Sequence, residues 1–188
     1  MKINRKLNLV LSVTRDDGVE VYVHSTPISR EIYEANFLAL SKTVSSMYEE
    51  GLAPGICSRV ALLMLKEVAT RLNRTEAIER TLLPEIWRLT NVIMPNEKGY
   101  ETVPFQTVIN NSLLNKEDIS EVQNFLTFFT AASWVHKNVE LETLIYPLLQ
   151  SSGGQTTSSN CTEYANSLQT SKLVENTGAT ATPSSIPI

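Results

Sequence analysis

The 188-residue sequence holds few of the residues from which most catalytic sites are built. It has two histidines, His24 and His136, and two cysteines, Cys57 and Cys161. Nucleophilic catalysis needs a base held beside a serine or cysteine, and neither histidine falls in a motif that supplies one. A thiol at a helix start, as at Cys57, can become more acidic, but a small buried residue is the favoured interpretation. The sequence therefore predicts no catalytic residues and no enzyme.

Motifs for metals and cofactors are also missing. The carboxylate pairs Glu31/Glu34 and Glu76/Glu79 have no histidine three or four residues away, as a di-iron helix would. The pair at 153–154, two glycines, is not followed by the lysine of a phosphate-binding loop and indicates a linker. We therefore expect no metal and no cofactor.

Strong positive charge and long apolar runs are absent as well. The net charge is −4 and the sequence pI about 5.3, so the basic footprint of a nucleic-acid-binding protein is missing. No window reaches the roughly 18 apolar residues of a membrane span, and residues 1–18 lack the apolar core of a signal peptide. Two distant cysteines are too few for a disulfide framework. These features predict free thiols in a reducing cytoplasm, with no nucleic-acid or membrane partner.

The first pattern that is present has a period of two. Apolar residues alternate with others over 7–13 and 19–23, and Asp16-Asp17-Gly18 supplies a turn between the two stretches. This pattern predicts an N-terminal β-hairpin. Because a lone hairpin is only marginally stable in water, we expect it to dock on the rest of the chain or on another subunit.

From residue 26 onward the apolar period changes to about 3.6, which is typical of amphipathic helices. Thr26 with Pro27 is a plausible start for a first helix, and Ser58 for a second. A third helical pattern covers 76–94, with a proline inside it, and a loop follows at 95–99.

A short helix at 104–114 and a long aromatic helix complete the pattern. Asn115 can cap the aromatic helix, whose first turn carries acidic residues that suit the helix dipole. Together the patterns predict a mainly α fold, in which an N-terminal β-hairpin precedes a bundle of about five helices within residues 1–150.

Residues 151–188 have a different composition, rich in Ser, Thr, Gly and Asn and poor in large apolar residues. Such a segment buries too little apolar surface to offset an ordering cost of about 1–2 kcal/mol per residue. The sequence therefore predicts a disordered polar C-terminal segment.

The long aromatic helix is the first candidate for partner binding. Phe125, Phe128 and Phe129 share a face, and Trp134 lies roughly opposite, so the helix is apolar around much of its circumference. Such a helix is either central to the core, which is the favoured interpretation, or covered by a partner or by a second subunit of a homo-oligomer.

The polar segment contains the second candidate. Thr162 could cap a short helix that presents Tyr164 and Leu168 on one face. This pattern is typical of a recognition element that folds when it binds a partner, and a chance occurrence explains it equally well.

Three stretches resemble proteins encoded among the tail genes of long-tailed bacteriophages. They are RDDGVEVYVHSTPISREIYE, NFLTFFTAASW, and TTSSNCTEYANSLQTS with its TPSSIPI ending. In them the chain resembles the tail assembly chaperones of siphovirus-type phages, which are small, mainly helical proteins; residues 76–99 match nothing in that family. The resemblance implies a non-enzymatic protein of the host cytoplasm that binds the tape-measure protein and helps recruit tail tube protein.

Two other functions remain as hypotheses. A structural virion protein, either a head–tail connector or a tube-associated component, would add its hairpin to a neighbour's sheet. A regulatory protein that binds a host target is the third hypothesis.

Overall fold

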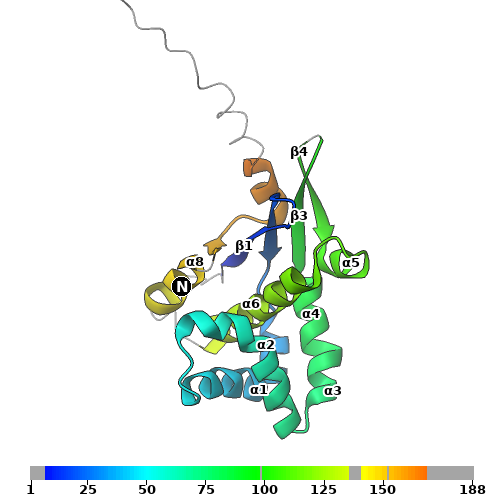
Figure 1. Ribbon diagram of the computed structural model, residues 1–188. Helices are drawn as coiled ribbons and strands as arrows, with labels where there is room; N and C mark the ends of the chain where they lie inside the picture. The colour runs from blue at the N-terminus through cyan, green and yellow to red at the C-terminus, as the bar shows by residue number, and fades with distance from the viewer. Residues whose placement is uncertain (1–6, 98, 136–140, 152, 169–188) are drawn as a thin grey trace, which may run out of the picture.

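The computed structural model describes residues 7–97, 99–135, 141–151 and 153–168. Five strands form one antiparallel sheet in the order β4-β3-β2-β1-β5 (Figure 1). They are β1 (Asn8–Thr14), β2 (Glu20–Ser25), β3 (Thr90–Asn96), β4 (Gly99–Pro104) and β5 (Gly154–Thr157). The prediction of a mainly α fold with a single hairpin was therefore wrong.

The predicted hairpin is confirmed, and it forms the centre of the sheet. β1 pairs with β2 from Leu9↔Ser25 to Thr14↔Glu20. In the turn, the amide of Gly18 donates to the carbonyl of Arg15 at 2.8 Å, and Gly18 has a φ of +77°, which glycine adopts without steric cost. β1 also pairs with β5, and β2 with β3. Both edges of the hairpin are thus paired within the chain, so the predicted addition to a neighbour's sheet does not use this hairpin.

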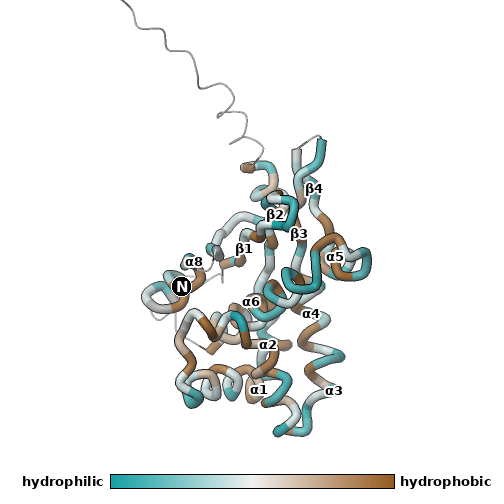
Figure 2. Tube along the Cα trace, in the orientation of Figure 1, coloured by the Kyte–Doolittle hydropathy of each residue, from teal (hydrophilic) through white to brown (hydrophobic). Residues whose placement is uncertain are grey.

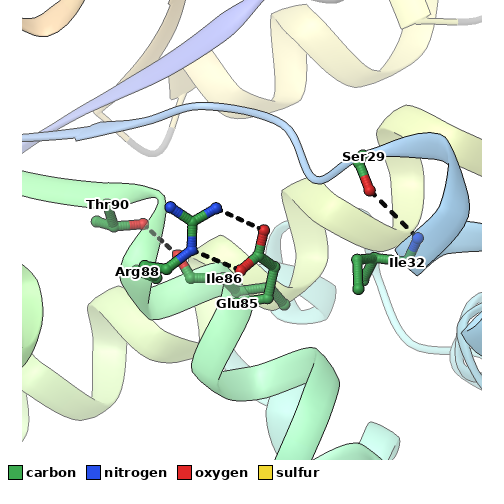
Figure 3. A network of polar contacts seen from close by, with 6 residues as sticks. All are labelled: Ser29, Ile32, Glu85, Ile86, Arg88 and Thr90. Carbon is green, nitrogen blue, oxygen red and sulfur yellow. Dashed lines mark hydrogen bonds and ion pairs between the residues drawn. The ribbon is translucent and has the colours of Figure 1, made fainter.

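Strand β3 replaces the end of a predicted helix. The helical region that starts at residue 75 ends at Arg88, and β3 begins at Thr90. Thr90 Oγ1 donates to the carbonyl of Ile86 at 2.8 Å (Figure 3). It also lies 2.9 Å from Ser25 Oγ, so Thr90 joins the last helical turn to β2. Because β3 is buried on both faces, its apolar run lacks the period-two signal of a half-exposed strand.

Helices occupy the two long connections of the sheet, β2–β3 and β4–β5. Between β2 and β3 lie α1 (Arg30–Glu49), α2 (Pro54–Arg71), α3 (Thr75–Ala77), the π-helical η1 (Ile78–Leu82) and α4 (Leu83–Arg88). After β4 come α5 (Phe105–Asn110) and α6 (Lys116–Val135), and before β5 come η2 (Leu141–Ile145) and α8 (Tyr146–Ser151). Figure 1 shows α1, α2 and α6 grouped together.

Side-chain caps fix where two of the long helices begin. Ser29, rather than Thr26, caps α1, and its Oγ accepts a hydrogen bond from the amide of Ile32 at 3.3 Å (Figure 3). Asn115 caps α6 as predicted, with its Oδ1 accepting from the amide of Asp118 at 2.7 Å.

The main core lies between these helices and one face of the sheet, here called the inner face. The strands contribute alternate residues such as Leu11, Val23 and Val92, which are paired across β1, β2 and β3. The helices contribute large apolar side chains such as Leu40 and Leu126. Alternation along each strand therefore places every second residue in this core.

The polar C-terminal segment is part of the fold as far as it is described. Its residues 154–157 form β5, and residues 161–168 are helical. The prediction of disorder was wrong for these residues, while 169–188 lie outside the described residues. β5 fits beside β1 because Gly154 has no side chain: a Cβ there would lie 2.7 Å from Phe125 Cζ and 3.1 Å from the carbonyl oxygen of Leu149.

Candidate binding surfaces

The aromatic residues of α6 lie in two environments: three of them are buried in the main core, and the fourth is half-buried against α1. Phe125, Phe128 and Phe129 are buried in the main core, which fits the favoured interpretation of this helix. Trp134 is half-buried and stacks on Tyr33 of α1, with ring centroids 4.5 Å apart and planes 13° from parallel. The three phenylalanine rings are therefore covered within the chain, and of the four residues only Trp134 is not fully buried.

A buried amide joins α6 to α2. Asn124 Oδ1 accepts from the amide of Leu62 at 3.0 Å, and its Nδ2 donates to the carbonyl of Ser120 at 2.9 Å. Because both polar groups of the side chain are satisfied, the residue can stay buried at the helix interface without a desolvation penalty. The contact fixes α2 against α6 and so determines which side of α2 faces outward.

The exposed sides of α1 and α2 carry large apolar side chains that the sequence analysis did not single out. In the described part of the chain, all the large apolar residues that remain exposed lie on these two helices; they are Phe37, Leu38, Tyr48, Ile56 and Leu63. We call these five residues the α1–α2 surface. Figure 2 shows how hydrophobic residues recur along both helices. Leu63 is 63% exposed and Phe37 51%, so the core does not account for them.

The spacing within the α1–α2 surface is that of helix packing. Ile56 and Leu63 are seven residues apart, and Phe37 and Tyr48 are eleven apart, and both intervals return to the same side of an α-helix. The ring of Phe37 also lies edge-on to Tyr33, with centroids 5.8 Å apart. The aromatic cluster on α1 thus extends from the covered Tyr33–Trp134 stack to an exposed ring.

A cavity of about 610 Å³ opens between the β1–β2 turn and the start of α6. Asp118, which lines it, has a buried Oδ2 without a hydrogen-bond partner, and burial together with the nearby Asp16 raises the pKa of its carboxyl. Arg15 also lines the cavity but forms an ion pair with Asp17 at 3.1 Å. Among the described residues, no three histidine, cysteine or carboxylate side chains are grouped so as to hold a metal ion.

The thiols and the described histidine are all shielded from solvent to some degree. Burial raises the pKa of both the Cys57 and the Cys161 thiol, which is opposite to the shift that activates a nucleophilic cysteine. Burial lowers the pKa of His24, and this lowering is partly opposed by the hydrogen bond to the carbonyl of Ser159. His136 lies outside the described residues.

The outer face of the sheet is covered by the chain's own residues 153–168, here called the cover segment. β5 starts it at one edge of the sheet, and at the other edge Cys161 Sγ lies 4.0 Å from Thr102 Oγ1 on β4. Tyr164 packs its ring against Tyr22 and His24 of β2, with centroids 6.0 Å and 6.4 Å away. The helix at 161–168, orange in Figure 1, therefore begins beside β4 and lies against β2.

Polar contacts hold the cover segment in place. The carbonyl of Ser159 accepts from Asn8 Nδ2 at 2.9 Å and lies 3.0 Å from His24 Nε2. Gln155 Nε2 donates to the hydroxyl of Tyr164 at 2.7 Å. Tyr164 and Leu168, predicted to face a partner, are each half-buried, and the contacts of Tyr164 are with this sheet.

The helix of the cover segment begins with a capping box. Asn160 Oδ1 accepts from the amide of Glu163, and Glu163 Oε2 accepts from the amide of Asn160, both at 2.9 Å. The prediction that Thr162 caps this helix was therefore wrong by two residues. The signal was present in the sequence, since asparagine followed three residues later by glutamate is a recognised helix start.

Comparison of the chain with known protein families, with curated proteins and with solved structures gave no match. Within the described residues, no helix has both the length and the apolar character needed to cross a membrane.

Proposed function

We propose that this protein is a non-enzymatic tail assembly chaperone of a long-tailed phage, which binds the tape-measure protein in the host cytoplasm and helps recruit tail tube protein. The observation that carries the proposal is the α1–α2 surface, because all the large apolar side chains that remain exposed in the described residues lie on these two packed helices, and such a concentration is typical of a binding site. The resemblance of the sequence to tail assembly chaperones narrows the partner to phage tail proteins.

The geometry of the α1–α2 surface suits a helical partner. A partner helix with apolar residues every seven positions could lie along α2 and cover Ile56 and Leu63 together. A tape-measure protein, as a very long helical chain, would expose such repeats until the tail tube encloses it. The chaperone would then act by covering apolar surface, which needs neither a cofactor nor a catalytic group.

The test is capture of the tape-measure protein by co-expression and pull-down. Leu63→Gln should reduce capture by roughly tenfold, because a well-packed apolar contact contributes more than about 1.4 kcal/mol. Lys66→Gln is the matched control, since it places the same side chain at another exposed position on α2. Both variants should melt like the parent, because neither position is buried. Equal capture by Leu63→Gln and the parent would contradict the proposal.

A structural virion protein remains the alternative, and one observation favours it. β4 is an edge strand of the sheet that the described residues form, and half of its side chains are exposed, so its outward edge could pair with a strand of a neighbouring subunit. Analysis of purified virions separates the two functions. A chaperone should be absent from them, whereas a head–tail connector or tube-associated component should be present at a fixed copy number.

A further inference from the structure

We propose that the outer face of the sheet is a second binding surface, which takes a short capped helix of a partner protein, and that the cover segment occupies it as an internal ligand. This inference does not rest on the proposed function, because it concerns a different surface from the one on α1 and α2. The contacts that the cover segment makes with the sheet define which partner helix the surface would bind.

The floor of this surface is apolar and separate from the main core. Val10 and Ile93 point to the outer face, opposite to Leu11 and Val92, and they are 1% and 0% exposed. Neither belongs to the main core, and the same holds for Ala165 of the cover segment, which is also buried. The outer face thus has buried apolar residues outside the main core, and both the sheet and the cover segment contribute them.

The cover segment itself buries few apolar side chains. Of its residues 158–168, Ala165 is the only one that is fully buried, while Tyr164 and Leu168 stay partly exposed. The segment is otherwise held by the short β5–β1 ladder and by a few hydrogen bonds at its surface. Regions with few buried apolar contacts open locally at a lower free energy than the core. Residues 158–168 of the cover segment can therefore leave while β5 and the inner core stay folded.

The donors of the outer face specify what it binds. Asn8 Nδ2 and His24 Nε2 both reach one carbonyl oxygen, that of Ser159, in the turn just before the helix. The aromatic ring of Tyr164 packs against Tyr22 and His24, and the small residue Ala165 follows it in the sequence. The surface therefore fits a short helix with a free carbonyl before its cap, an aromatic residue in its first turns and a small residue next to that.

The two cysteines of the full chain report on opening. Cys161 lies in the cover segment, and Cys57 lies in the main core at 3% exposure, so alkylation of Cys161 measures release and alkylation of Cys57 measures global unfolding. Tyr164→Ala should raise the alkylation rate of Cys161 by roughly tenfold, the effect of about 1.4 kcal/mol, and leave that of Cys57 unchanged. Lys66→Ala is the control, because Lys66 is exposed on α2, belongs to neither binding surface and should change neither rate.

The binding probe is a fluorescent peptide of residues 158–168 with serine in place of Cys161, followed by anisotropy. It should bind the Tyr164→Ala chain more tightly than the parent, and the same peptide with alanine in place of Tyr164 should not bind. Thr102→Cys provides a lock, because position 102 lies beside Cys161 and oxidation can join the two thiols. The oxidised lock should bind no peptide, and reduction should restore binding.

Three results would overturn the proposal. The first is that Cys161 becomes reactive in the Tyr164→Ala chain but this chain binds no peptide. The exposed outer face would then not be a binding surface. Another, which needs no variant, is that unlabelled peptide at high concentration fails to accelerate alkylation of Cys161 in the parent chain. The third is a parent chain that dimerises in sedimentation experiments while the oxidised Thr102→Cys chain stays monomeric, which would assign the surface to a second copy of this chain.

Discussion

The two faces of the sheet are made by the same strands but are covered in different ways. On the inner face, Leu9 and Leu11 of β1 belong to the main core, to which α1, α2 and α6 contribute many large apolar side chains. On the outer face, Val10 of the same strand lies beneath a single short segment in which Ala165 is the buried apolar residue. Val10 and Ile93 are as well buried as the residues of the inner face, but fewer apolar side chains cover them.

This difference predicts two levels of stability in one sheet. Burial of a large apolar side chain contributes about 1.5–3 kcal/mol, so a face covered by many of them opens only when the protein unfolds. A face covered by a small side chain and a few hydrogen bonds opens at a fraction of that free energy. The inner face therefore determines whether the chain folds, and the outer face can respond to a partner or to solution conditions.

The largest effect should come from placing a charge on the inner face. Val21 is 0% exposed there, so Val21→Lys should lower the free energy of unfolding by about 4 kcal/mol or more, as measured by urea denaturation. Val10→Lys is the matched variant on the outer face. It should release the cover segment and expose Cys161 to alkylation, at a much smaller cost in global stability. Equal losses in the two variants would show that the faces are not distinct.

Gly154 is the point where the cover segment touches the inner core. Gly154→Ala should lower the free energy of unfolding by about 1–3 kcal/mol, because the new methyl group would overlap the ring of Phe125, which is held in the core, and meet a backbone carbonyl. Gly55→Ala is the control, since nothing lies within 4 Å of its added Cβ and alanine favours the helix. A neutral Gly154→Ala would mean that β5 contributes nothing to the fold.

His24 should make the stability of the fold dependent on pH. Its folded-state pKa lies below the ordinary value of 6.5 because burial disfavours the charged imidazole, so the unfolded chain binds the proton more tightly. The stabilising contribution is complete above pH 6.5 and is lost as the pH falls through 6.5 toward the folded-state pKa. Urea denaturation between pH 8 and pH 5 should show this loss.

His24→Gln supplies the control for the pH experiment. Glutamine keeps a donor that can reach the carbonyl of Ser159 but does not titrate, so the difference between parent and variant isolates this residue from His136. An identical pH dependence in both chains would show that His24 does not couple protonation to folding.

Local signals in the sequence were sufficient for some elements. The hairpin has a period-two pattern with a turn of Asp16-Asp17-Gly18, and α6 has its cap at Asn115 and its acidic first turn, and the structure confirms both. The burial of Phe125, Phe128 and Phe129 also followed from an apolar helix. In each case the residues that decide the structure are neighbours in the chain.

Elements that depend on distant residues were missed. β3 is an apolar run buried on both faces, and periodicity alone cannot distinguish such a run from a buried helix. β5 has a weakly β-forming sequence, Gly-Gln-Thr-Thr, and becomes a strand because β1 offers an edge and Phe125 leaves room only for glycine. A sequence pattern contains no information on either of these contacts.

The candidate surfaces show the same limit. On α1 the buried stripe includes small or polar residues, Asn36, Ala39 and Thr43, which moves Phe37 and Tyr48 to the outside. An i, i+3, i+4 count along α1 does not find this frame, because Phe37, Leu40 and Tyr48 also follow that spacing with Val44. Tyr164 was correctly placed on a short helix, but no local signal could show that the helix packs against its own sheet.

The smallest effect should come from the cap of the helix on the outer face. Asn160→Ala removes one half of the capping box, which typically costs a helix about 1 kcal/mol. If the cover segment opens before the core, this cost should appear as faster alkylation of Cys161, by roughly fivefold, with almost no change in global unfolding by urea. Thr162→Ala is the matched control, because Asn160 rather than Thr162 supplies the capping oxygen in this structure. If Asn160→Ala instead lowered global stability by the full capping energy, the cover segment would unfold together with the core, and the distinction between the two faces would fail.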